Sequence, residues 1–470
     1  MRVLTVLLLF PALASAQRPP VKLTVDPTPE AKPALRHELL PNARDRVAGN
    51  AVLYYLQAYA ARPPEERDPT KRTAEYERYL RWEEAAPDKL PAKEVGEFLK
   101  RYRALFRELE YGARCKSCEW ASAPAAGNET INETLGHVQS FRELARWLSL
   151  RCKLEIAEGR PDDALRTIQT GLQFGKHVAE GPTMIQMLVG NAITSIFLGR
   201  IDWLLERPGA SNLYWALSTL PKPFLDPRPG LDGEDRQTES FLPGLAELQK
   251  GPLSAERTLE LVVKAIGAFQ GQPDGGGLGE LGLRVAITSV AQIQQAEARK
   301  EFLARGRDAK EVAAMSAVQV VYLNSFARYR DLADDYRKWI LLGGPEGIAG
   351  IEKMGERVRK IKADAKDDLV FQVFLNILPA TEKVFESLLR TDRRIAFLRT
   401  HEAIRIHAAL SGQLPRELAE IKKVPVPSDP TTGKPFLYSV TDAGFTLATP
   451  ETKNGAQLAL KYEVTLRVRK

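Results

Sequence analysis

The sequence predicts a mainly α-helical protein, built as an irregular antiparallel helical bundle or a solenoid-like array, with a small C-terminal α+β module. Apolar residues recur at three- and four-residue spacing from position 42 to about position 411, which is the period of an amphipathic helix. After position 412 the sequence predicts a short helix over 414–421 and a proline-rich turn, followed by an alternation of apolar and polar residues, as in half-buried strands. A chain of 470 residues exceeds the size of one hydrophobic core, so we expect at least two packing units.

The composition excludes several classes of protein. Hydrophobic residues make up 44% and charged residues 27% of the chain, which excludes wholesale disorder, collagen-like repeats and a polytopic membrane protein. The 67 Lys and Arg residues only slightly outnumber the 60 Asp and Glu residues. We expect no nucleic-acid partner, because such a partner needs positive charge concentrated on one face.

Residues 1–16, MRVLTVLLLFPALASA, have the features of a secretory signal. Arg2 precedes a short apolar run, and the small residues at 14–16 form a cleavage site. We expect cleavage after Ala16 and a periplasmic or extracellular mature protein. The alternative is an uncleaved anchor, but the apolar run is short for a hydrocarbon core of roughly 30 Å. The uncharged segment 181–199 contains several polar residues, so we expect a buried helix there and no integral membrane segment after cleavage.

The remaining chain divides into three parts by composition. Residues 17–40 are rich in proline and predict an extended linker. Residues 41–378 predict a helical domain with a flexible glycine-rich loop at 271–279, and residues 379–470 a long helix followed by a small β module. Windows with helical period cover residues 71–86, 91–111, 137–158, 161–179, 183–206, 211–219, 254–270, 280–305, 309–341, 346–365 and 379–411. Strand-like runs cover residues 435–440, 444–448 and 458–468.

Two parts of the chain resemble parts of known proteins. Residues 154–171, LEIAEGRPDDALRTIQTG, resemble one tetratricopeptide-type helix hairpin, with Ala164 as the small residue at the helix contact. The pattern does not recur at a 34-residue period, so a generic antiparallel hairpin is favoured and a degenerate repeat is the alternative. The Leu-Pro turn near 414, the Asp-Pro at 429–430 and the Tyr-bearing strand at 435–440 resemble the C-terminal part of a type II secretion pseudopilin, which implies a similar fold for residues 380–470 only.

The phrases at 118–120, 171–182, 212–217 and 429–438 resemble those of uncharacterised, exported, mostly helical proteins of planctomycete-type bacteria. This resemblance covers most of the mature chain. It implies export and a helical architecture, and it implies no particular activity.

Short stretches that resemble catalytic or metal-binding motifs lack the structural context or the spacing that those motifs need. Residues 277–282 match GxGxxG but follow a glycine-rich loop rather than a strand, so we expect a linker instead of a dinucleotide site. His401 and His407 are six residues apart and point to different sides of a helix, so they cannot share a metal ion. We expect no metal and no cofactor, and the sequence leaves any catalytic residues unknown.

Three cysteines are the candidate site residues. Cys115 and Cys118 form a C-x-x-C pair, which predicts either a local disulfide or a redox pair. Cys152 lies among apolar residues, so it is either a buried apolar side chain or the bridge partner of Cys115 or Cys118. The connectivity cannot be read from the sequence.

These observations favour a non-enzymatic function. We expect a cell-envelope interaction or scaffold protein that presents helical surfaces to an envelope protein or a glycan. The alternative is a hydrolase or lyase acting on an extracellular polysaccharide or peptidoglycan, with acidic residues distant in sequence gathered in a cleft. A C-terminal module that docks on secretion machinery is a third hypothesis.

Overall fold

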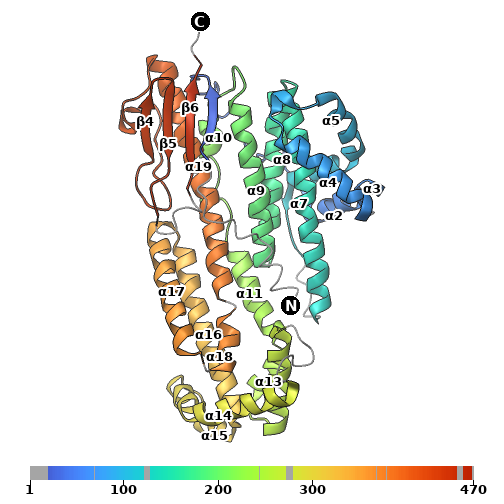
Figure 1. The fold of residues 1–470 in the computed structure, drawn as a ribbon, viewed down its shortest axis with the longest axis vertical. Helices are drawn as coiled ribbons and strands as arrows, with labels where there is room; N and C mark the ends of the chain where they lie inside the picture. Colours follow the sequence, from blue (N-terminus) through green and yellow to red (C-terminus); the bar gives the residue numbers. More distant parts are fainter. Residues whose placement is uncertain are drawn as a thin grey trace. The chain divides into compact units, whose positions relative to one another are not determined.

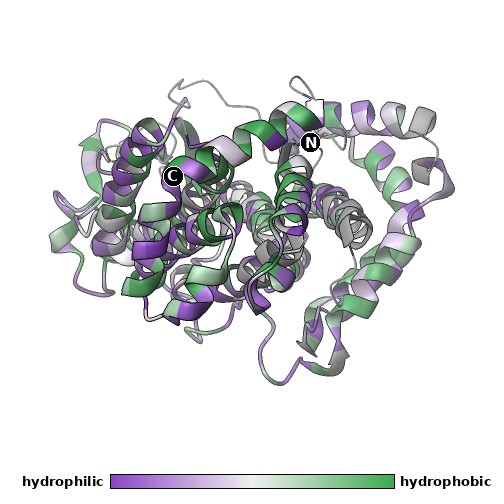
Figure 2. Cartoon of the chain, turned by 90° about the horizontal axis from the view of Figure 1, so that it is seen from below, coloured by the Kyte–Doolittle hydropathy of each residue, from purple (hydrophilic) through white to green (hydrophobic). Residues whose placement is uncertain are grey.

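A computed structural model describes residues 19–67, 69–120, 127–242, 244–270, 279–366, 368–376, 378–452 and 459–467. The expected export signal, and the expected loop except for its last residue, lie outside these ranges. Helices dominate and a small sheet holds the C-terminal strands (Figure 1), which confirms the predicted fold class. Most helices carry hydrophobic and hydrophilic residues around the same turn, as amphipathic helices do (Figure 2).

The chain forms two compact units. Unit 1 is built chiefly from Leu231–Phe385, and unit 2 from Ser15–Ser122, Ile131–Gly230 and Glu386–Lys470. Composition had instead placed all helices between 41 and 378 in one domain. The difference arises because the chain passes from unit 2 to unit 1 near residue 230 and returns near residue 386, both within helical segments where composition does not change.

The helices of unit 2 that precede unit 1 in the sequence lie between residues 51 and 218. They are α2 (Ala51–Ala60), α3 (Pro64–Arg67), α4 (Pro69–Glu84), α5 (Ala92–Leu99), α6 (Arg103–Arg114), α7 (Gly127–Ala157), α8 (Pro161–Ala179), α9 (Met184–Leu205) and α10 (Tyr214–Ser218). Local sequence sets their ends. Gly159, at φ +70°, follows α7, and Pro161 opens α8, which is the expected placing of glycine after a helix and proline at the start of the next. Thr183 caps α9 by accepting the N–H of Gln186.

Helices α8 and α9 approach closely enough to require glycine on both sides. A Cβ added to Gly190 of α9 would lie 2.4 Å from both the Ala179 nitrogen and the Gly175 oxygen of α8. A Cβ added to Gly175 would lie 2.9 Å from the Gly190 oxygen. The two backbones are therefore in direct contact, and this pair forms the centre of the helical part of unit 2.

Helix α9 is, among the described residues, the one helix long and apolar enough to cross a membrane by length and composition. Its polar side chains are nevertheless used inside the protein. Asn191 donates to the carbonyl oxygen of Ser387 at 3.0 Å and accepts the hydroxyl of Thr391 at 2.6 Å. Polar side chains with partners of this kind are usual in a core helix, and the absence of a membrane segment over residues 181–199 stays a prediction.

The sheet of unit 2 joins the two ends of the chain. Its strand order is β1 (Val21–Val25), β6 (Lys461–Leu466), β5 (Gly444–Ala448) and β4 (Leu437–Thr441), seen side by side in Figure 1. Strand β1 is parallel to β6, and the other neighbours are antiparallel. The expectation of a linker over 17–40 was therefore wrong for residues 21–25, because the partner strand of this short alternating run lies at the far end of the sequence. A second pair, β2 (Val47–Asn50) and β3 (Cys115–Ser117), is also parallel.

Helix α19 (Pro379–Ser411) covers one face of the four-stranded sheet from residue 386 onward. The ring of Phe397 lies 4.8 Å from that of Tyr462 in β6, and the ring of His401 lies 5.9 Å from that of Phe445 in β5. Buried residues of the strands complete this core: Leu23, Val25, Phe445, Leu447, Tyr462 and Val464. The predicted long helix and β module therefore pack on each other.

Unit 1 is entirely helical in its described residues. It contains most of α11 (Arg228–Phe241), then α12 (Leu245–Lys250), α13 (Ala255–Gln270), α14 (Gly279–Ala304), α15 (Ala309–Ala314), α16 (Ala317–Leu342), α17 (Gly344–Asp364) and α18 (Leu369–Leu375). The single helix predicted over 309–341 is in fact two, because Ser316 interrupts it and caps α16 by accepting the N–H of Gln319. Helix α16 packs against α14, α17 and α18 and forms the centre of the unit.

Candidate functional site

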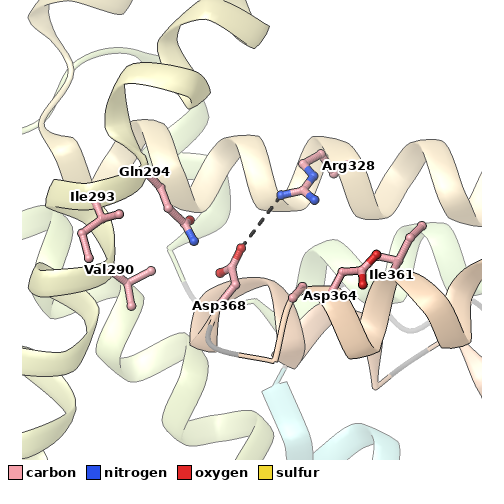
Figure 3. Close-up of a pocket in the computed structure, with 8 residues that line it drawn as sticks. Val290, Ile293, Gln294, Arg328, Ile361, Asp364 and Asp368 are labelled. Carbon is pink, nitrogen blue, oxygen red and sulfur yellow. Dashed lines mark ion pairs between the residues drawn. The ribbon is translucent and has the colours of Figure 1, made fainter.

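Unit 1 holds a half-open groove of about 490 Å³ between α14, α16 and the α17–α18 turn. Figure 3 shows the residues that line it, converging from three helices. The apolar lining residues are Val290, Ile293, Ile361 and Ala365, and the polar ones are Gln294, Arg328, Asp364 and Asp368. The groove is therefore amphipathic.

Helical spacing explains why these residues meet. Val290, Ile293 and Gln294 of α14 stand at positions i, i+3 and i+4, so they share one side of the helix. Ile361, Asp364 and Ala365 repeat this spacing at the end of α17. The buried face of α14 packs into the unit beside these residues, which leaves Ile293 at the rim with 81% of its surface exposed.

Arg328 of α16 contacts two partners in the groove. One guanidinium nitrogen lies 3.9 Å from a carboxylate oxygen of Asp368, and the guanidinium carbon lies 3.9 Å from the ring centre of Phe371 (Figure 3). Asp368 is buried and also caps α18, because its other oxygen accepts the N–H of Phe371 at 3.0 Å. Arg328 thus makes a long ion pair on one side and a cation–π contact on the other.

The rim of the groove carries an excess of negative charge. Asp364 is exposed and, within the part of the chain that the structure describes, makes no ion pair. Arg328 already faces Asp368, so the second carboxylate is uncompensated among the lining residues. An incoming group that combines an apolar side chain with a nearby positive charge matches this lining.

The three cysteines predicted as site residues lie in unit 2, away from the groove's lining. All three are free thiols in the structure. Cys152 is fully buried and its sulfur lies 3.7 Å from the carbonyl oxygen of Ala164, and Cys118 donates to the carbonyl oxygen of His177 at 3.5 Å. Burial raises the pKa of both thiols well above the ordinary value, which lowers the thiolate fraction available for disulfide exchange.

The C-x-x-C pair is held apart by strand β3. Cys115 begins this extended strand and Cys118 follows its end, so their Cα atoms are separated by about 10 Å at roughly 3.3 Å per residue. A disulfide needs a Cα separation below about 7 Å. A bridge between Cys115 and Cys118 therefore stays a prediction that requires β3 to change conformation.

The sequence reasoning missed a buried ionic cluster on α19. Arg405 donates to both carboxylate oxygens of Glu402, at 2.8 and 3.1 Å, and neither side chain is exposed. Glu402 also accepts the N–H of Leu213 at 2.6 Å, and His401 lies 3.2 Å from it. Burial alone would raise the pKa of Glu402, but Arg405 and His401 outweigh it and hold that pKa below its usual value. A glutamate and an arginine three residues apart within an apolar run are the signal that could have revealed this pair.

Arg405 also fixes two distant segments. It donates to the carbonyl oxygen of Asp26 at 2.9 Å, to the hydroxyl of Thr28 at 2.8 Å and to the carbonyl oxygen of Ala210 at 3.0 Å. The cluster therefore ties the segment after β1 and the loop before α10 to α19. These contacts all lie within unit 2 and link segments of its backbone that are distant in sequence, which is a structural role.

His401 and His407, which the sequence predicts cannot share a metal ion, both lie on α19. His401 is buried and His407 is half-buried. Among the described residues, no group of three or more His, Cys, Asp or Glu side chains is placed to hold a metal ion.

Asp392 of α19 makes the stability of unit 2 depend on pH. Burial raises the pKa of its carboxyl to about 6. The N–H of Phe224, which the carboxylate accepts at 2.8 Å, lowers this pKa and offsets only part of the effect of burial. Between pH 3.8 and about 6 the folded state then binds more protons than the unfolded state, so stability falls as the pH rises through this range.

We expect Asp392→Asn to stabilise the protein at pH 7 by about 1–2 kcal/mol, since it removes the desolvated charge and keeps an oxygen for Phe224. The gain should shrink toward zero below pH 4. Urea unfolding at pH 3.5, 5 and 7 measures this, and an equal effect at every pH would contradict it.

Comparison with protein families, curated proteins and solved structures finds no significant match.

Proposed function

We propose that this chain is an exported interaction or scaffold protein of the cell envelope without catalytic activity, and that the groove of unit 1 receives a segment of a partner protein. The observation that carries the proposal is the lining of the groove, in which an exposed isoleucine and an uncompensated carboxylate stand beside a long ion pair. The export part rests on the secretory features of residues 1–16.

The lining of the groove indicates which kind of partner segment could bind there. An aliphatic side chain inserted among Val290, Ile293 and Ile361 would remove apolar surface from water. A Lys or Arg a few residues away would pair with Asp364 at the rim. The partner segment is therefore an apolar residue next to a basic one, presented by an envelope protein.

Site-directed photo-crosslinking tests this assignment. A photo-reactive amino acid at position 293 should capture one partner reproducibly from envelope extract, whereas the same group at position 281 should not. Leu281 is a matched control, because it lies on the same helix, is 75% exposed and does not line the groove. Capture of glycan in place of protein at position 293 would overturn the choice of occupant, and equal capture at both positions would overturn the site.

The captured partner, once purified, allows a quantitative test. We expect Ile293→Asp and Asp364→Lys each to weaken its binding at least tenfold, because the first removes the apolar contact and the second reverses the rim charge. Leu281→Asp should leave the affinity unchanged. Calorimetric titration of the three variants against the same partner gives the answer, and a loss common to all three would exclude a groove-specific contact.

A specific observation also favours the second candidate, a hydrolase or lyase acting on an extracellular polysaccharide or peptidoglycan. Two carboxylates, Asp364 and Asp368, line the same groove, and pairs of carboxylates carry out glycoside cleavage. Release of soluble fragments from peptidoglycan or polysaccharide by the purified chain, abolished by Asp364→Asn, would establish this function. Release that persists in the variant would place the activity elsewhere.

Export has its own test. The protein recovered from the envelope fraction should begin at Gln17 when its N-terminus is sequenced, since cleavage is expected after Ala16. Recovery of the intact Met1 terminus in the membrane fraction would indicate an anchor instead.

A further inference from the structure

We propose that strand β4 pairs with β4 of a second copy of this chain, which joins the two four-stranded sheets into one. This inference is independent of the groove in unit 1. It follows from the state of the two edges of the sheet, from the pattern of β4 itself and from the charges at its ends.

The two edges of the sheet differ in the contacts that their outer strands make. The β1 edge is contacted by the residue that follows α9 and by the turn after it. The N–H of Thr24 in β1 reaches a carboxylate oxygen of Glu206, and the N–H of Gly209 bonds to the carboxylate of Asp26. Strand β4, at the other edge, pairs only with β5 among the described residues.

The hydrogen-bond parity shows which groups of β4 face outward. Thr441 and Gly444 close the two-residue hairpin between β4 and β5, so Thr441, Ser439 and Leu437 direct their backbone groups toward β5. The bond from the Thr449 N–H to the Leu460 carbonyl oxygen, on the β6 side of the chain, agrees with this parity. Tyr438 and Val440 therefore direct their N–H and C=O groups away from the sheet, and none of the described residues bonds to those groups.

The sequence of β4 leaves this edge unprotected. Natural edge strands usually carry a lysine, a proline or an inward-pointing charge that blocks pairing with another chain. Strand β4 reads LYSVT, with neither charge nor proline, and exposes 54% of Leu437 and 50% of Val440. An uncharged edge with exposed apolar side chains is a surface for strand addition.

The pattern of β4 matches an antiparallel copy of itself. Pairing centred on Ser439 places Tyr438 opposite Val440 of the second copy, twice by symmetry, and these are the residues whose backbone groups face outward. Each pair is an aromatic residue opposite a β-branched one, a combination that stabilises antiparallel strands. The four outward backbone groups of each copy are then all satisfied.

The flanking charges fit the same register. Lys434 precedes β4 and Asp442 follows it, and both are exposed. In the pairing centred on Ser439 they become diagonal neighbours across the interface, at a distance that a lysine side chain can span. Opposite charges thus meet at both ends, whereas a parallel pairing would place like charges together.

Cysteine crosslinking tests the register. The two copies of Ser439 face each other as a non-hydrogen-bonded pair, with Cα atoms about 4.5 Å apart, so a disulfide can form between them. We expect purified Ser439→Cys to give a covalent dimer with oxidised glutathione at least ten times faster than Thr441→Cys. Thr441 is the matched control, because it lies on the same strand and face and its copies would be four residues out of register. The unmodified chain gives the background from Cys118, which is only partly buried.

A second variant separates pairing from chance collision. Val440→Lys puts a charge on the free edge without removing a bond to β5, and in the Ser439→Cys background it should reduce crosslinking at least tenfold. Sedimentation velocity of the unmodified chain should show a concentration-dependent dimer that Val440→Lys abolishes. Equal crosslinking of Ser439→Cys and Thr441→Cys, or crosslinking of Ser439→Cys that Val440→Lys does not change, would overturn the proposal.

Discussion

Arg405→Met should destabilise unit 2 by about 3–5 kcal/mol, the range found when one partner of a buried ion pair is removed. The substitution leaves Glu402 charged and fully buried without its main partner. It also removes the donor to Asp26, Thr28 and Ala210, so the segment after β1 loses its attachment to α19. The free energy of unfolding in urea measures the loss. Tryptophan fluorescence reports mainly on unit 2, because five of the six tryptophans belong to it and only Trp339 to unit 1.

Two controls identify the cause. Arg405→Met combined with Glu402→Gln should recover part of the loss, since the buried charge is then gone and an oxygen still accepts the N–H of Leu213. Arg399→Met on the same helix, where the arginine is only half-buried, should cost much less. A double variant no more stable than Arg405→Met would argue that packing, rather than an isolated charge, explains the loss.

Asp429→Ala is expected to have an effect of similar size, about 3–5 kcal/mol, on the attachment of the C-terminal strands. The buried carboxylate of Asp429 accepts hydrogen bonds from two guanidinium nitrogens of Arg393, one of them at 2.6 Å. It also accepts the N–H and the hydroxyl of Thr431. The same guanidinium donates to the carbonyl oxygen of Pro450 at 2.7 Å. Removing the carboxylate leaves Arg393 charged at the centre of unit 2 and releases the turn before β4.

Limited proteolysis together with urea unfolding distinguishes this local release from global loss. Asp429→Ala should expose new cleavage sites between residues 424 and 452, at protease concentrations that leave the unmodified chain intact. Asp442→Ala, in the exposed hairpin turn of the same module, should change stability by less than about 0.5 kcal/mol. Equal stability of the two variants would show that the Arg393–Asp429 pair contributes little.

The helical part was predictable because it depends on local patterns. The ends of α8 follow from Gly159 and Pro161, and the alternation in β6 is visible over six residues. Strand β1 was not predictable, since its five residues acquire strand structure by pairing with residues more than 400 positions away. The break at Ser316 was missed because apolar residues continue on both sides of it, and only the capping bond shows that the helix restarts.

The groove residues could not be predicted for a different reason. Arg328, Asp364 and Asp368 each look like solvated helix residues in sequence, and helical period alone does not reveal which faces of α14, α16 and α17 meet. The cysteines, by contrast, have a conspicuous sequence pattern that the structure does not use. Their C-x-x-C spacing predicts a disulfide or a redox pair, but burial of Cys118 and the extended form of β3 disfavour a bond between Cys115 and Cys118 in this conformation.

The parallel pairing of β1 with β6 has a consequence for how the protein is made. Strand β1 finds its neighbour only when β6, more than 400 residues later, has been synthesised, and Arg467 then donates its N–H to the carbonyl oxygen of Val25. The residues of unit 1 emerge in between, as an insertion within unit 2. Unit 2 therefore stays incomplete until β6 has been synthesised, and its four-stranded sheet can close only after the whole of unit 1 has been made.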